Sequence, residues 1–180
     1  YPITDSKIKT IEMFQRMANK IKNYISSKID GRITIGIGKP VHEAEDLSIS
    51  YEQSSEALEY RLFSGQEDII YYEDIALNKE SKNIKYPYKK EDQILAMLKS
   101  GNLEETGKRT EDFLQYYLEH ENINPDFFRK ACLQLLYSVV KMLIKWDISL
   151  DSINNLVNDA ESSIKTLNSI VILKERFVNT

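Results

Sequence analysis

Several features that would indicate secretion, a disulfide scaffold or membrane insertion are absent from this 180-residue chain. It contains a single cysteine, so no internal disulfide can form. No apolar run reaches the roughly 20 residues that span a bilayer, and the N-terminus lacks the basic and then apolar layout of a signal peptide. We therefore expect a cytoplasmic chain that does not itself contact a membrane.

An excess of positive charge is also absent. Lys and Arg total 24 against 28 Asp and Glu, which gives a formal net charge of -4 and a pI of about 5.4. Because no overall positive field attracts phosphate backbones, we expect no direct contact with nucleic acid. One short basic patch with interleaved tyrosines is interpreted as a solvated linker. It comprises Lys82, Lys85, Tyr86, Tyr88, Lys89 and Lys90.

Residues that ligate metals or act as nucleophiles are few. The two histidines, His42 and His120, lie in unrelated segments without metal-ligand spacing, so they are interpreted as solvated surface residues. Cys132 follows Ala131 on a predicted helix, where a small buried hydrophobe is favoured over a catalytic thiol. We predict no catalytic, cofactor-binding or metal-binding residues, no cofactor and no enzymatic activity.

Clustered carboxylates are the remaining metal-site candidates. Mg²⁺ sites usually combine one or two converging carboxylates with substrate phosphates, and no phosphate-binding loop accompanies these residues. They are interpreted as solvated turn residues and as helix N-terminal acids that complement the helix dipole. The clusters are Glu43, Glu45 and Asp46, then Glu67-Asp68, and finally Glu73-Asp74.

The first half of the chain predicts the order helix, strand, helix, strand. Apolar residues at three- and four-residue steps predict a helix with one buried stripe: Ile8, Ile11, Phe14, Ala18, Ile21, Ile25 and Ile29. Ile33, Ile35 and Ile37 then alternate as in a strand, and Gly36 and Gly38 allow a backbone or helix to approach its other face. Lys39-Pro40 follows instead of a helix start, so this glycine pair does not indicate a dinucleotide site.

A helix and a second strand complete this half. Ser50 and Gln53 fit a capping box, in which each side chain satisfies an exposed backbone donor at the start of a helix that runs to about Phe63. The β-prone run Ile69–Tyr72 predicts the second strand.

The second half predicts helices only. Polar residues 78–85 mark a boundary, and Gly101 is the predicted C-cap of the first helix after it. Asn124 and Pro125 open a long helix as N-cap and first helical residue. The predicted helices contain residues 94–98, 103–117, 125–146, 149–157 and 164–178.

The strand–helix–strand segment resembles the last βαβ unit of a GGDEF-type, nucleotidyl cyclase-like domain. Active members have a strand ending in Ser-Ile-Gly, a helix with Ala-Asp-x-Ala-Leu-Tyr-x-Ala-Lys, a Gly turn and a strand ending in Tyr. Ser55 stands here at the family's Asp and Leu62 at its Lys, and the signature Gly-Gly-Asp/Glu-Glu-Phe hairpin is absent. The resemblance therefore implies a degenerate unit without cyclase activity. The matching segments are Thr34–Gly38, Ser54–Leu62, Ser64-Gly65 and Ile69–Tyr72.

More specifically, the chain looks like the middle region of AraC-type transcriptional regulators. The residues that carry this likeness are the Ile-Gly-Ile-Gly strand, Tyr51–Tyr60, Tyr86-Pro-Tyr88 and Ile94–Asn102. In those proteins such a region lies between a sensor or receiver domain and a C-terminal helix-turn-helix domain. The resemblance implies a non-catalytic signal-coupling and dimerisation module that forms a homodimer. Because the chain starts and ends within apparent helices, we expect a longer polypeptide whose DNA-binding domain follows Thr180.

We therefore predict an α+β fold, a partial GGDEF-like βαβ unit followed by an all-α segment. The expected parts are the C-terminal part of a degenerate GGDEF-like domain (1–76), a linker (77–90) and a helical linker or dimerisation segment (91–180). The Ile8–Ile29 and Ile164–Val178 helices are candidate partner surfaces. Two alternatives stay open: a module that binds a nucleotide such as GTP or cyclic di-GMP, and a fragment of a diguanylate cyclase.

Overall fold

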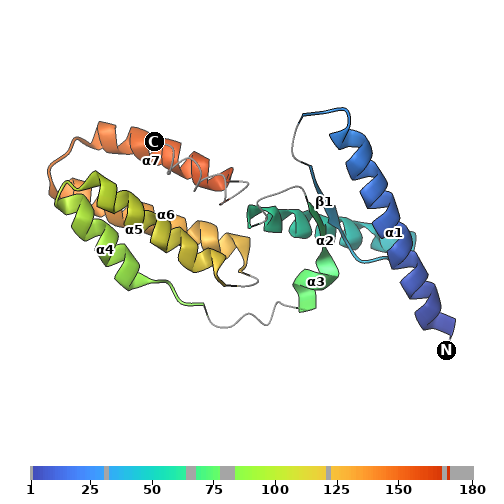
Figure 1. Ribbon diagram of the computed structural model, residues 1–180. Coiled ribbons are helices and arrows are strands. Elements are labelled where there is room, and N and C mark those ends of the chain that lie inside the picture. Colours follow the sequence, from blue (N-terminus) through green and yellow to red (C-terminus); the bar gives the residue numbers. More distant parts are fainter. Residues whose placement is uncertain are drawn as a thin grey trace. The chain divides into compact units, whose positions relative to one another are not determined.

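The computed structural model describes residues 2–30, 33–63, 68–77, 84–120, 123–167 and 170. The chain divides into two compact units, Tyr1–Glu80 and Ser81–Thr180, each of which is described by itself (Figure 1). Within the described residues, none of the helices combines the length and the apolar character needed to cross a bilayer.

The first unit is a parallel βαβ arrangement with an additional helix at each end (Figure 1). Its two strands pair in parallel, with Gly36 opposite Ile70 and Ile37 opposite Tyr71. The predicted order of helix, strand, helix and strand is confirmed. The elements are α1 (Pro2–Ser26), β1 (Thr34–Ile37), the 3-10 helix η1 (Ala44–Asp46), α2 (Leu47–Glu59), the 3-10 helix η2 (Tyr60–Leu62), β2 (Asp68–Tyr71) and α3 (Tyr72–Leu77).

A small core holds this unit together. Ala57 of α2 and Leu62 of η2 are fully buried, and Ala18 of α1 and Ile75 of α3 are nearly so. The sequence predicts a strand to Tyr72 and no helix after it, whereas β2 ends at Tyr71 and the short helix α3 begins at Tyr72; the interpretation of Glu73 and Asp74 as helix N-terminal acids is confirmed. In the structure they lie in the first turn of α3, where carboxylates complement the helix dipole, and Ile75 becomes part of the core.

The prediction of one buried stripe on α1 is wrong in part. Ala18 is buried and Ile11 and Ile25 are partly buried, but Phe14 and Ile21 are exposed. Ile29 lies beyond the end of α1 and is also exposed. Periodic spacing places residues on one side of a helix, whereas burial also needs an element that packs there. Ile8 lies in a part of α1 whose side chains are outside the description.

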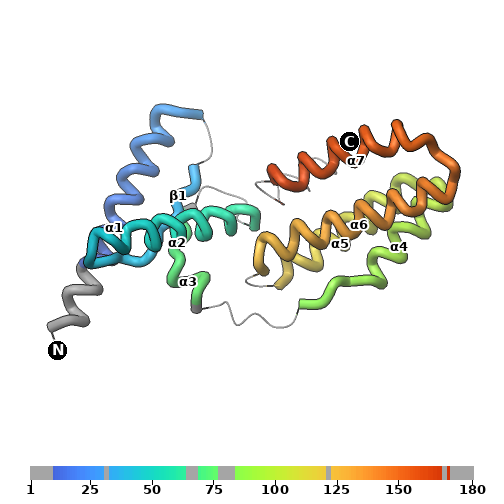
Figure 2. The backbone as a smooth tube through the Cα atoms, turned by 180° about the vertical axis from the view of Figure 1, so that it is seen from behind, coloured from blue at the N-terminus to red at the C-terminus, as the bar shows by residue number. Residues whose placement is uncertain are grey.

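The second unit consists of helices that pack in pairs, α5 on α4 and α7 on α6, with α4 also contacting α6 (Figure 1 and Figure 2). Its centre is aromatic, since Phe113, Tyr117 and Phe128 are buried and their rings meet edge to face. The helices are α4 (Tyr88–Lys99), α5 (Leu103–Leu118), α6 (Pro125–Lys145) and α7 (Leu150–Lys165).

The ends of these helices follow local sequence signals. Gly101 has a positive φ of 72° and follows Ser100, which is the C-cap of α4, so the glycine lies at the predicted helix end but one residue past the cap. Asn124 Oδ1 accepts hydrogen bonds from the backbone N–H groups of Asp126 (2.8 Å) and Phe127 (3.2 Å), and Pro125 is the first residue of α6. The predicted opening of this helix is thus confirmed.

The predicted division of the last helices is wrong. A helix begins here as predicted, with Ser149 as its N-cap, but it continues past Val157 to Lys165. Its inward-facing residues, Ile153, Val157, Ala160 and Ile164, continue at three- and four-residue steps, so nothing in the pattern stops the helix at 157. Most of the predicted final helix, 164–178, lies outside the described residues.

Candidate functional site

The β1–α2 junction is the candidate nucleotide site of the first unit, if the chain is a nucleotide-binding module. A Cβ atom added to Gly38 would lie 2.0 Å from the carbonyl oxygen of Ser50. One added to Gly36 would lie 2.3 Å from that of Ser54. The two glycines therefore allow α2 to pack directly on the strand, as the sequence predicts, and their role here is close packing.

Two side chains of α2 hold the end of β1. The Ser50 hydroxyl donates to the carbonyl oxygen of Lys39 (2.8 Å), and the Lys39 N–H donates to Gln53 Oε1 (2.9 Å). The capping-box prediction for Ser50 and Gln53 is therefore wrong. Because α2 already begins at Leu47, these residues lie inside the helix. Their side chains satisfy the backbone hydrogen-bonding groups at the end of the strand, and not those at the start of the helix.

A hollow on the α1 side of this junction is too small for a nucleotide. It has a volume of about 20 Å³, which is enough for about one water molecule. Pockets for drug-sized ligands occupy about 300 Å³ or more. Its lining is mostly apolar, and comprises Ile11, Phe14, Ile37, Gly38, Pro40, Tyr71 and Glu73.

Among the described residues, the charged side chain that is buried is the carboxylate of Glu91, in the first turn of α4. It is only 9% exposed. Its Oε1 accepts a hydrogen bond from the Ser138 hydroxyl of α6 (2.8 Å), and its Oε2 accepts one from the Tyr86 hydroxyl. A buried carboxylate needs such donors, because burial without them costs several kcal/mol. We call Tyr86, Glu91 and Ser138 the Glu91 cluster.

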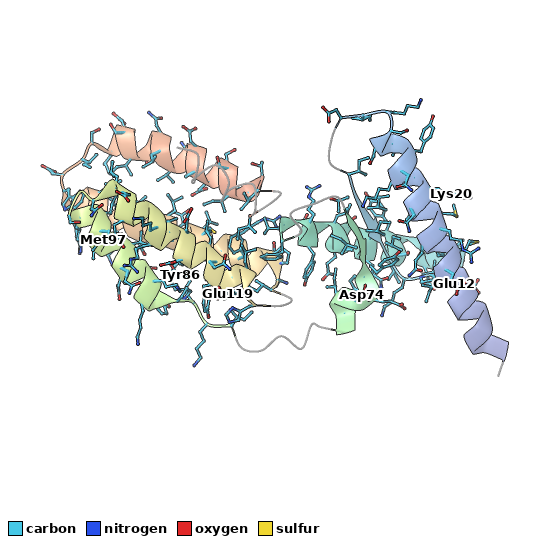
Figure 3. The ribbon with its side chains drawn as sticks, in the orientation of Figure 1. Glu12, Lys20, Asp74, Tyr86, Met97 and Glu119 are labelled. Carbon is cyan, nitrogen blue, oxygen red and sulfur yellow. The ribbon has the colours of Figure 1, made fainter. Side chains whose placement is uncertain are left out.

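The chain enters the helical unit through this cluster. Figure 3 labels Tyr86 on the segment that leads into α4. Its ring meets Phe113 of α5 edge to face, at 5.9 Å between centroids. One residue earlier, the carbonyl oxygen of Lys85 accepts a hydrogen bond from the Tyr116 hydroxyl (3.0 Å). The segment before α4 is thus bound to α4 and α5, and through Glu91 to α6.

Buried hydroxyl and thiol groups of this unit hold their protons tightly. Burial, together with the hydrogen bond to Glu91, raises the pKa of Tyr86, and burial also raises the pKa of Tyr117. The Tyr117 hydroxyl is buried without a hydrogen-bond partner in the described structure. Burial raises the pKa of the Cys132 thiol from 9.0 to about 12. Cys132 therefore carries no thiolate near neutral pH, which supports its predicted structural role.

The remaining candidate residues of the sequence analysis, none of which was predicted to form a site, lie apart from one another. His42 is exposed, as expected for a solvated residue. His120 is partly buried instead, with Nδ1 2.6 Å from the carbonyl oxygen of Tyr116 and its ring against the Tyr116 ring, so its solvated interpretation is wrong. Across the described ranges, His, Cys, Asp and Glu side chains form no group of three that could hold a metal ion. Glu67 lies outside those ranges.

The basic patch is divided by the structure. Lys85 and Lys89 are exposed and Tyr88 is 63% exposed, whereas Tyr86 belongs to the Glu91 cluster. Lys82 lies outside the described residues. Sequence reasoning missed the cluster, because 47 residues separate Glu91 from Ser138 and neither belongs to a motif. The one available signal was Glu91 itself, a charged residue three positions before the apolar Ile94.

Comparison with known proteins gives one informative result. No protein-family model matches the chain, and no solved structure matches it. The chain is 28% identical over 163 residues to YtdP of Bacillus subtilis (strain 168), an uncharacterized HTH-type transcriptional regulator. The match covers 87% of this chain and 21% of that protein, so the chain spans about a fifth of the length of this curated relative. The chain is thus similar to one part of an HTH-type transcriptional regulator.

Proposed function

We propose that this chain is a non-catalytic signal-coupling and dimerisation module of an AraC-type transcriptional regulator, with the DNA-binding domain outside these residues. The observation that carries the proposal is the similarity to an HTH-type regulator along 87% of the chain. The parallel βαβ unit supports the GGDEF-like part of the proposal, since its order and glycine positions agree with the resemblance.

The Glu91 cluster supports a coupling role. A change in the first unit can reach the helices through the segment that enters the second unit, and Lys85 and Tyr86 attach that segment to α4 and α5. Glu91 carries the attachment on to α6 through Ser138. Displacing the segment therefore requires three helices to repack or the cluster to break. The bound segment and the displaced segment are then the two discrete arrangements that a switch needs.

A reporter assay in the complete regulator tests this proposal. The promoter next to the gene drives the reporter, and Tyr86→Phe is compared with Tyr88→Phe, which removes the hydroxyl of an exposed tyrosine at the start of α4. With expression adjusted so that the three proteins are compared at equal cellular levels, we expect Tyr86→Phe to alter regulated expression at unchanged binding of operator DNA, and Tyr88→Phe to match the wild type. Equal regulation by all three proteins would contradict the coupling role.

Nucleotide binding is the competing function, and it predicts a different result. A ligand that binds the folded chain stabilises it, by about 2.7 kcal/mol at a hundredfold excess over Kd, and the melting temperature rises as a result. The backbone of α2 fills the space beside Gly36 and Gly38, and the adjoining hollow holds about one water molecule. We therefore expect no change in melting temperature with GTP or cyclic di-GMP. A saturable shift with either would favour the nucleotide-binding module instead.

A further inference from the structure

Tyr117 of α5 is fully buried, yet its hydroxyl has no hydrogen-bond partner among the residues that the structure describes. Its ring packs against four other aromatic rings, whose centroids lie 5.2 to 6.3 Å away. These contacts stabilise the ring, whereas a hydroxyl that is buried without a partner costs free energy. The folded arrangement of the helical unit therefore carries an unfavourable contribution at this hydroxyl. The four rings belong to Phe113, Tyr116, Phe127 and Phe128.

Tyr117 lies close to the Glu91 cluster. The ring of Phe113 contacts the rings of both Tyr117 and Tyr86, at 5.3 and 5.9 Å between centroids. Burial and the hydrogen bond to Glu91 raise the pKa of Tyr86, and the nearby Tyr117 raises it further. The two tyrosines thus share one buried region, but they differ in their hydrogen bonds. The Tyr86 hydroxyl donates to Glu91, and the Tyr117 hydroxyl donates to none of the described groups.

Residues 85–87, which we call the entry segment, lie at the outer side of this region. Tyr86 is partly exposed, whereas Phe113 and Tyr117 are buried. Two hydroxyls hold the segment in place: that of Tyr86 donates to Glu91, and that of Tyr116 donates to the carbonyl oxygen of Lys85. The ring that separates the aromatic centre from solvent is therefore carried by the segment through which the chain enters the unit.

We propose that the unpaired Tyr117 hydroxyl destabilises the closed entry segment and so makes the Glu91 cluster easy for an input to open. Displacement of the segment withdraws the Tyr86 ring and admits water, which supplies the hydrogen bonds that the Tyr117 hydroxyl lacks. The closed arrangement gains the bond from Tyr86 to Glu91, and the open arrangement gains the hydration of Tyr117. A small free-energy difference between two arrangements is what lets an input shift their populations. The inference rests on the proposed function, because it specifies how the coupling site is balanced.

Hydrogen exchange of the chain measures this balance at the start of α4. The N–H groups of Lys90 and Glu91 donate to the carbonyl oxygen of Pro87 (2.9 and 3.2 Å), so displacement of the entry segment breaks both bonds and lets these amides exchange. Tyr117→Phe keeps the ring and removes the unpaired hydroxyl. We expect both amides to exchange at least about fivefold more slowly in this variant, which is the factor that corresponds to the lower limit for an unpaired buried hydroxyl.

Two further variants complete the comparison. Tyr86→Phe removes the bond to Glu91 and should make the same two amides exchange faster than in the wild type. Tyr137→Phe removes the hydroxyl of a tyrosine of α6 that is 49% exposed, and it should leave both rates unchanged. The exchange of these amides should also depend little on low concentrations of urea, because opening of a short segment exposes little surface.

Three results of the exchange experiment would overturn the inference. Unchanged rates in Tyr117→Phe would show that the hydroxyl does not act on the entry segment. Faster exchange in this variant would show that the hydroxyl is satisfied in the closed arrangement. A steep dependence on urea would show that the two amides exchange only when the whole unit unfolds.

The reporter assay separates this inference from the coupling role. At equal cellular levels, Tyr117→Phe should shift regulated expression in the direction opposite to Tyr86→Phe, and a shift in the same direction would overturn the inference. Unchanged exchange in Tyr117→Phe, together with altered regulation by Tyr86→Phe, would overturn the inference and leave the coupling role intact. Slower exchange in Tyr117→Phe, together with wild-type regulation by Tyr86→Phe, would support the balance at the Glu91 cluster and contradict the coupling role.

Discussion

Ser138 in α6 donates a hydrogen bond to Glu91 in the first turn of α4, at 2.8 Å and across 47 residues of sequence. Tyr86 donates to the other oxygen of the same carboxylate, so a single buried side chain connects two helices with the segment that enters the helical unit. The two hydrogen bonds contribute to the stability of the second unit, and the proposed coupling to the first unit depends on them.

Removal of the Tyr86 hydroxyl should destabilise the helical unit. Tyr86→Phe keeps the ring contact with Phe113 but leaves one oxygen of the buried Glu91 carboxylate without its donor. We expect the free energy of unfolding, measured in urea, to fall by about 1 to 3 kcal/mol. Tyr88→Phe is the matched control, because Tyr88 is 63% exposed. An equal loss in both variants would show that the hydroxyl bond to Glu91 contributes nothing.

Two glycine substitutions should act in opposite directions. Gly38→Ala places a Cβ 2.0 Å from a backbone oxygen of α2, so α2 or β1 must shift, at a cost of about 1 to 3 kcal/mol or more. Gly107 lies within α5, and a Cβ added there meets no neighbouring atom, so Gly107→Ala should stabilise the folded chain by about 0.5 to 1 kcal/mol. Thermal melting of both proteins checks this. A Gly38→Ala protein as stable as the wild type would refute close packing at the β1–α2 junction.

The contribution of the N-cap of α6 to stability should also be measurable. Asn124→Ala removes the acceptor for two backbone N–H groups at the start of the helix. We expect a loss of about 1 kcal/mol in the free energy of unfolding. Asn158→Ala changes an exposed asparagine within α7 and should leave stability nearly unchanged. If Asn158→Ala costs as much as Asn124→Ala, the cap is not the source of the effect.

Cys132 predicts a loss of stability at alkaline pH. Its pKa is raised from 9.0 to about 12 in the folded chain, so the native state keeps the thiol proton while the unfolded state loses it. The unfolded state therefore binds fewer protons between these values, and stability falls as pH rises from 9 to 12. Below pH 9 the thiol contributes no pH dependence.

Urea unfolding of the wild type and of Cys132→Ala at several pH values isolates this effect. The wild-type free energy of unfolding should decline more steeply between pH 9 and 12, because Tyr86 and Tyr117 titrate in both proteins and the thiol in only one. Parallel curves for the two proteins would show that the thiol is not desolvated by folding.

Local chemistry made much of the fold predictable. Gly101 and Asn124 are helix-end signals in the sequence, and in the structure Gly101 follows the C-cap of α4 with a positive φ and Asn124 is the N-cap of α6. The alternation of Ile33, Ile35 and Ile37 predicted a strand, and Gly36 and Gly38 predicted the close approach of another element. At the junction Ser50 and Gln53 were recognised as capping residues, but their partner is the end of a strand 11 or more residues away.

Contacts between distant segments were not predictable. The Glu91 cluster joins residues that share no motif, and Tyr86 was assigned to a linker because its neighbours are basic. The exposure of Phe14 and Ile21 depends on what packs beside α1, which periodicity cannot report. The proposed coupling depends on the Glu91 cluster, so sequence patterns alone could suggest a regulatory module without indicating which contacts join its parts.

The central claim is that this chain is the coupling module of a helix-turn-helix regulator. Sequencing of the reading frame on both sides of the segment tests it most directly. The account predicts a helix-turn-helix pair shortly after Thr180, following a sensor or receiver domain. A stop codon directly after Thr180, together with an intact Gly-Gly-Asp-Glu-Phe hairpin encoded before Tyr1, would contradict it and assign the chain to a nucleotide cyclase.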